Sequence, residues 1–131
     1  MNALDDVQLS TFSFAYNDII GQDRWSVWTP VFGSLTVVGA TSYAGRFRVV
    51  GRSCQFQVQF SAATSIASAA GTDYLTLPIK AAGYAGLGIM MNATTKIAVG
   101  ICSFDIANSR CYIPMQLASA NVFTLAGEYE I

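Results

Sequence analysis

The 131-residue sequence contains no histidine, and its charge is sparse: seven basic and eight acidic residues make up 11% of the chain. Without histidine, neither Ser-His-Asp nor Cys-His catalysis can be assembled. The three cysteines are an odd number without a Cys-x-x-Cys pair, which argues against a zinc site or a disulfide framework. We therefore expect no cofactor and no metal, and since no nucleophile–base set can be found, no enzymatic activity.

Long hydrophobic runs are also missing, although 53% of the residues are hydrophobic. None approaches the roughly 18 residues that a helix needs to span a bilayer, so we expect no membrane insertion. The start, MNALDDVQLS, carries two aspartates and no positive cluster, unlike a secretory signal. A net charge of -1 gives no electrostatic basis for binding nucleic acid.

The low charge has a consequence for assembly. A folded chain of this mass exposes about 6,700 Å². Fifteen formal charges on such a surface give a lower density of charge than soluble domains usually have. We therefore expect part of the surface to be buried against other copies of the chain.

Short runs of strand-forming residues, separated by turn signals, fill most of the sequence. The runs are STFSFAY, WSVWTPVF, SLTVVG, YLTLPI, GIMMN, KIAVGICSFD, RCYIPM and NVFTLAGEYEI. The small residues from Thr64 to Asp73 are expected to form a loop. No stretch keeps a helical period for ten residues, and roughly eight to ten strands at this spacing predict an all-β fold, an antiparallel β-sandwich or jelly roll.

The clearest hairpin lies in GRFRVVGRSCQFQVQF, from Gly45 to Phe60. Gly51-Arg52 is typical of a two-residue II′ turn, because the first central position needs a positive φ. The resulting register places Phe47 opposite Phe56, Val49 opposite Cys54, Arg48 opposite Gln55 and Arg46 opposite Gln57. Arginines and glutamines then form one polar face, while the other face belongs to the core.

A second hairpin is predicted with its turn at Ile106-Ala107, which places Phe104 opposite Ser109 and Cys102 opposite Cys111. Cysteine most often behaves as a small buried hydrophobe, so we expect these cysteines to be core residues. A disulfide is disfavoured in a chain without a secretory signal.

The stretch WTPVFGSLTVVGATSYAGRFRVVGRSCQFQVQF resembles a module of tailed-bacteriophage tail fibres, tailspikes and receptor-binding tips. In that module a Trp-Thr-Pro start precedes a Gly-Arg-aromatic strand, a Val-Gly turn and an alternating strand rich in aromatics and valine. The matching residues are Trp28 to Pro30, Gly45 to Phe47, Val50 and Gly51, with YLTLP and LAGEYEI as further strand ends. The likeness covers residues 25–131; a cysteine where the second strand begins departs from the pattern.

The resemblance implies a homotrimeric β-sandwich, similar to tumour necrosis factor-like jelly rolls, that binds a host surface glycan or protein. Residues 25–131 would be the sandwich domain. Residues 1–24 would be an N-terminal extension or docking segment, with a strand pattern, that contacts other virion proteins. The expected location is the virion, assembled in the host cytoplasm. The alternative is a structural virion component without a ligand, such as a capsid decoration (cement) protein or a fibre-docking collar protein.

Candidate ligand-binding residues are aromatic and polar side chains near loops. Tyrosine stacks on the apolar faces of sugars while its hydroxyl group bonds to theirs. The candidates are Tyr43, Tyr84, Asn92, Asn108 and Arg110.

Two other pairs of residues have a simpler interpretation. Trp25 and Trp28 are expected to be packing anchors. Glu128 and Glu130 share a strand face, which superficially suggests a glycosidase pair, but no further acid can be placed near them.

Overall fold

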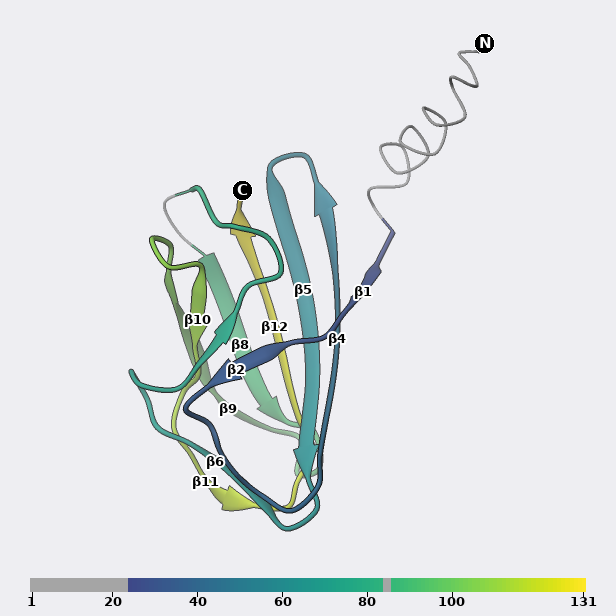
Figure 1. Ribbon diagram of the computed structural model, residues 1–131, viewed down its shortest axis with the longest axis vertical. Helices are drawn as coiled ribbons and strands as arrows, with labels where there is room; N and C mark the ends of the chain where they lie inside the picture. The colour runs from purple at the N-terminus through teal and green to yellow at the C-terminus, as the bar shows by residue number, and fades with distance from the viewer. Residues whose placement is uncertain (1–23, 84–85) are drawn as a thin grey trace.

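The computed structural model describes residues 24–83 and 86–131, which form an all-β, antiparallel fold (Figure 1). The described residues contain no helix. The strands are β1 (Ser26–Trp28), β2 (Val31–Gly33), β3 (Thr36–Val38), β4 (Thr41–Val50), β5 (Ser53–Ala62), β6 (Ser65–Ser68), β7 (Tyr74–Thr76), β8 (Gly86–Asn92), β9 (Ile97–Asp105), β10 (Arg110–Tyr112), β11 (Gln116–Ser119) and β12 (Phe123–Glu130). The predicted strand STFSFAY and the predicted docking segment, up to residue 23, lie outside the described residues.

The strands form two sheets, one of which curls around the core. The larger sheet has the order β1-β4-β5-β12-β8-β9-β10-β7-β2, and the smaller has the order β11-β6-β3. Only Thr29 and Pro30 separate β1 from β2, so the two ends of the larger sheet are close in the chain (Figure 1). This curled arrangement is consistent with the expected β-sandwich.

The core lies between the two walls of the curled sheet. Phe56, Phe60 and Tyr129 point inward from β5 and β12 and are at most 2% exposed. From the opposite wall, the ring of Phe32 in β2 lies 4.9 Å from that of Phe60. Burial of each such ring contributes about 1.5–3 kcal/mol, so these contacts help to hold the two walls together.

Glycines make room for the aromatic rings on the inner face. A Cβ atom on Gly127 would lie 2.7 Å from Cζ of Phe56, and one on Gly86 would lie 2.6 Å from Cδ2 of Phe104. The rings therefore lie directly against the backbone of β12 and β8. This close approach requires residues without a side chain at these positions.

Tyr129 fixes the connection between β7 and β8. Its hydroxyl group donates to the carbonyl of Ile79 (2.6 Å) and accepts from the amide of the same residue (3.0 Å). Burial raises the pKa of Tyr129, and the neighbouring Cys54 thiol raises it further. One buried hydroxyl group thus satisfies both backbone polar groups of Ile79.

The predicted hairpin of β4 and β5 is confirmed with its register. Phe47 lies opposite Phe56 and Arg48 opposite Gln55, as the two-residue turn requires. Gly51 has φ 63°, in the region that favours glycine, while Arg52 is not among the residues with positive φ. This pattern is the II′ turn expected from the sequence.

The predicted register of the second hairpin is wrong by two residues. Cys111 of β10 pairs with Phe104 of β9, not with Cys102, because four residues rather than two form the turn. The carboxylate of Asp105 accepts a hydrogen bond from the amide of Asn108 (3.2 Å), and Ser109 has φ 53°. These features close a longer turn than the predicted one.

The cysteines are nevertheless core residues, as expected. All three are buried and free. Cys102 and Cys111 share the inner face, and the contact between their thiols, together with burial, raises the pKa of Cys111.

The prediction of a loop from Thr64 to Asp73 is also wrong, because this segment contains β6. β6 pairs with β3 and β11, and Ile66 anchors it in the core at 1% exposure. Its other residues are small, so the sequence carries only one strong strand signal there. β6 is therefore a strand because it pairs with β3 and β11, and not because its own residues favour strand structure.

Candidate functional site

The outward face of β4, β5, β12, β8 and β9 changes from polar to apolar across the sheet. One register row shows the change: Arg46, Gln57, Ala126, Ile89 and Ile101 lie side by side from β4 to β9. We define the polar half as Trp25, Arg46, Arg48, Gln55, Gln57 and Gln59. We define the apolar half as Leu87, Ile89, Met91 and Ile101, with β12 between the two halves.

Side-chain hydrogen bonds hold the arginines of the polar half in place. Arg46 donates to Oε1 of Gln57 through Nε (2.9 Å) and Nη2 (2.7 Å). Arg48 donates through Nε to Oε1 of Gln55 (2.7 Å). These bonds use the glutamine oxygens, which leaves the amide nitrogens to other partners.

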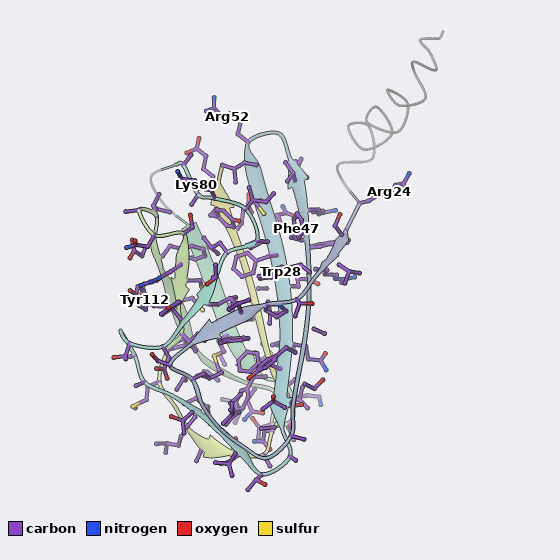
Figure 2. All side chains as sticks on the ribbon, in the orientation of Figure 1. Arg24, Trp28, Phe47, Arg52, Lys80 and Tyr112 are labelled. Carbon is purple, nitrogen blue, oxygen red and sulfur yellow. The ribbon has the colours of Figure 1, made fainter. Side chains whose placement is uncertain are left out.

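Trp25 lies over this pair of arginines. The Cζ atoms of Arg46 and Arg48 are 4.7 and 4.8 Å from the centroid of its ring. Contacts at this distance are favourable cation–π interactions. Trp25 is therefore a residue of the outer face, contrary to expectation, whereas Trp28 is a packing anchor with its ring 6.2 Å from that of Phe56. Figure 2 shows Trp28 and Phe47 on neighbouring strands, consistent with this packing.

A trough of about 1050 Å³ runs along this face. Trp25 and Arg48 line it on the side of β4, while Leu87 and Ile101 line it on the side of β8 and β9. Gln55, Gln57, Ala126 and Glu128, together with other residues of β5 and β12, also line the trough. It therefore combines an aromatic ring, amide and guanidinium donors, and an apolar wall.

The acidic residues of β12 also face the trough. Glu128 and Glu130 are both exposed on the same side of the strand, as predicted, and both line the trough. The carboxylate of Glu128 accepts a hydrogen bond from the hydroxyl group of Ser53 (2.6 Å). Glu128 thus supplies a fixed acceptor beside the donors of the polar half.

Two predicted ligand residues, Tyr43 and Asn92, make contacts within the fold. Tyr43 lies within β4 rather than beside a loop, and its ring packs 5.2 Å from that of Phe32. Asn92 ends β8 and is buried; its side-chain oxygen accepts hydrogen bonds from the amides of Thr94 and Thr95. Asn92 therefore closes the turn between β8 and β9.

Asn108 and Arg110 come together at the turn between β9 and β10. Asn108 donates to the carboxylate of Asp105 (2.8 Å), and this bond is the largest cause of the lowered pKa of Asp105. The guanidinium of Arg110 lies 4.1 Å from the ring centroid of Tyr74, which itself contacts Tyr112 (6.0 Å between ring centroids). This cluster belongs to the other wall, away from the trough.

The predicted ligand residues are thus not gathered into one site, and Tyr84 lies outside the described residues. Tyr43, Asn92, Asn108 and Arg110 do not line the trough. The sequence does contain a signal for this site, the alternation of arginine and glutamine, but this pattern was interpreted as a solvated face. Trp25 joins that face only because β1 pairs with β4.

The chain matches no family model, no curated protein and no solved structure. Within residues 24–83 and 86–131, no three histidine, cysteine, aspartate or glutamate residues lie close enough to hold a metal ion. The described part of the chain also contains no helix that is long and apolar enough to cross a membrane. The function must therefore be argued from the geometry and from the sequence resemblance.

Proposed function

We propose that this chain is a receptor-binding module of a tailed-bacteriophage tail fibre or tip, which attaches to a glycan or protein on the host surface. In this proposal it is a jelly roll that works as a homotrimer on the virion, joined to other virion proteins through its N-terminal segment. The all-β fold and the resemblance of residues 25–131 support it. The observation that carries it is the position of Trp25 at the trough, held against two arginines.

The trough suits a glycan in particular. Sugars present apolar C–H faces, which stack on indole rings, and hydroxyl groups, which exchange hydrogen bonds with amides, guanidinium groups and carboxylates. Trp25 supplies the ring, Gln55 and Gln57 the amides, and Glu128 an acceptor. Since binding needs no covalent chemistry, the lack of a catalytic set does not count against this function. Three copies on one fibre would strengthen a weak single-site affinity.

Binding to a glycan array, and to host cells where a host is available, tests the proposal. Trp25→Ala should lower binding about 5- to 150-fold, because stacking on one aromatic ring contributes roughly 1–3 kcal/mol. Arg110→Ala is the matched control, since it removes an equally ordered cation–π contact from the opposite wall. If Arg110→Ala abolishes binding and Trp25→Ala does not, the trough is not the binding site.

A structural role on the virion is the second candidate, as a capsid decoration protein or a fibre-docking collar protein. The exposed apolar half favours it, because such a surface suits a permanent contact better than a transient one. An electron-microscopy map of the virion separates the two candidates. Density at the capsid or collar, together with no glycan signal, would favour the structural role.

A further inference from the structure

The trough is hollow because a short side chain lies between longer ones. In one register row, Ala126 of β12 is flanked by Gln57 of β5 and Ile89 of β8. Ala126 is exposed, so its methyl group forms part of the floor while the two neighbours rise on either side. The volume of about 1050 Å³ is at the upper end of the usual range for ligand pockets. The trough can therefore hold several linked sugar units rather than one.

The charged groups that line the trough cancel one another. Arg48 and Arg52 contribute two positive charges, while Glu128 and Glu130 contribute two negative charges. An anionic ligand would lie beside two carboxylates as well as two guanidinium groups, and like charges brought together in this way weaken binding. The balance of charge therefore favours a neutral glycan over an acidic one.

One register row crosses the trough with three different kinds of side chain. Gln55 of β5 lies opposite Glu128 of β12, which lies opposite Leu87 of β8. All three residues line the trough. Because neighbouring strands are only about 4.8 Å apart, the three side chains can contact one small group of a ligand at the same time.

Each of these side chains offers one kind of contact. Oε1 of Gln55 accepts a hydrogen bond from Nε of Arg48 (2.7 Å), so the amide nitrogen is the group that Gln55 can offer as a donor. Glu128 is held by the hydroxyl group of Ser53 (2.6 Å), and an ionised carboxylate can accept further hydrogen bonds. Leu87 is 71% exposed and offers only apolar contact. Across the sheet the row thus presents a donor, an acceptor and an apolar side chain.

An acetamido group presents the complementary order. A secondary amide is planar and trans, which places the carbonyl oxygen on one side and the N–H and methyl groups on the other. The carbonyl can accept from Gln55, the N–H can donate to Glu128, and the methyl group can pack on Leu87. A sugar hydroxyl group in this position would leave Leu87 in water, and a 6-deoxy methyl group would leave the donor and the acceptor unused.

We propose that the trough selects neutral oligosaccharides that contain N-acetylated amino sugars, with Gln55, Glu128 and Leu87 as the specificity-determining residues. This inference rests on the glycan binding of the proposed function and names the class of glycan. Trp25 stacks on a sugar ring, as in the proposed function, while the row of three side chains distinguishes an acetamido group from a hydroxyl group.

An array of matched oligosaccharides tests the selectivity of the native chain. The pairs are N-acetylglucosamine against glucose and N-acetylgalactosamine against galactose, each in the same linkage, with sialylated oligosaccharides as the anionic comparison. The acetylated member of a bound pair should bind at least about tenfold more tightly, as expected when a group fills an apolar contact and forms hydrogen bonds. Sialylated members should bind more weakly than the neutral acetylated ones.

A variant of the apolar wall tests the assignment of Leu87. Leu87→Ser should reduce the preference for the acetylated member about fourfold, the contribution of one buried methyl-sized group, and should leave binding of the hydroxyl member unchanged. Leu117→Ser is the matched control, because Leu117 is equally exposed (75%) but lies on β11, outside the trough. This control should keep the full preference.

Saturation-transfer NMR gives a readout that needs no variant. With the native protein and a bound acetylated oligosaccharide, the acetyl methyl protons should receive stronger saturation than the protons of the sugar ring.

Equal binding of both members of every bound pair, with loss of both in Trp25→Ala, would overturn the selectivity and leave the proposed function standing. Strongest binding of sialylated members would overturn the selectivity too. Binding of no oligosaccharide on the array would overturn this inference together with glycan binding itself.

Discussion

The polar and apolar halves of the outer face lie on strands of one sheet with continuous registers, yet their side chains suit different tasks. Gln57 and Ile89 occupy the same register row, on either side of Ala126. The inner row next to it runs under both halves: Phe56, Gly127, Gly88 and Cys102 follow one another. The backbone and the core thus supply a common platform, on which the outward residues change from polar to apolar.

The largest expected effect comes from removing the common platform. Phe56→Ala should lower the free energy of unfolding by about 3–5 kcal/mol, because a buried ring leaves a cavity. Phe56 is 1% exposed and contacts the rings of Trp28, Phe104 and Tyr129. Urea unfolding gives the value. If only ligand binding or only association suffered, the two halves would not share one platform.

A smaller effect is expected at the boundary between the halves. Gly127→Ala places a Cβ atom 2.7 Å from Cζ of Phe56, which should cost about 1–3 kcal/mol through overpacking. Gly88→Ala is the matched control, since its nearest atoms would lie at 3.2–3.3 Å and would need to move less. Differential scanning calorimetry should therefore show a larger drop in Tm for Gly127→Ala. Equal drops would mean that the ring of Phe56 moves aside freely.

The hairpin of β4 and β5, which builds the polar half, was predictable from the sequence, because one glycine fixes its turn and thereby its register. The hairpin of β9 and β10 was not, because the bonds from Asn108 to Asp105 compete with a tight turn and lengthen it by two residues. Local turn chemistry decided both outcomes, and only the first had an unambiguous signal.

The candidate site was less predictable than the fold. Trp25 reaches the polar half because β1 pairs with β4, a contact between segments about twenty residues apart whose register no local pattern fixes. The apolar half was equally hidden. In runs such as GIMMN and KIAVGIC both faces of the strand are apolar, so alternation cannot show which side faces outward.

Alkaline pH should destabilise the inner face. Burial raises the pKa of the Cys54 thiol, and the contact with Cys102 and burial raise that of Cys111. Burial also raises the pKa of Tyr129. The folded state thus prefers the neutral forms, and its stability is complete below the unfolded pKa values, about 8.5 for cysteine and 10 for tyrosine, and falls as pH rises above them.

Urea unfolding at neutral pH and near pH 10 measures this loss, and the midpoint should be lower at the higher pH. Tyr129→Phe removes one of the titrating groups, so its midpoint should depend less on pH, although the variant loses the hydrogen bonds to Ile79. An unchanged midpoint for the native protein would show that these groups are not protected from ionisation in the folded state.

The smallest effect on stability is expected in the polar half itself. Gln57→Ala removes the acceptor of two hydrogen bonds from Arg46, but both residues are exposed, so water replaces the lost partner. The free energy of unfolding should change by less than about 0.5 kcal/mol.

Glycan binding should weaken more clearly, because Gln57 lines the trough and orients Arg46, which lies against the ring of Trp25. A stability loss as large as that of Phe56→Ala, measured on the assembled protein, would mean that the polar half is itself buried between copies. In that case the polar half could not serve as an open ligand-binding surface.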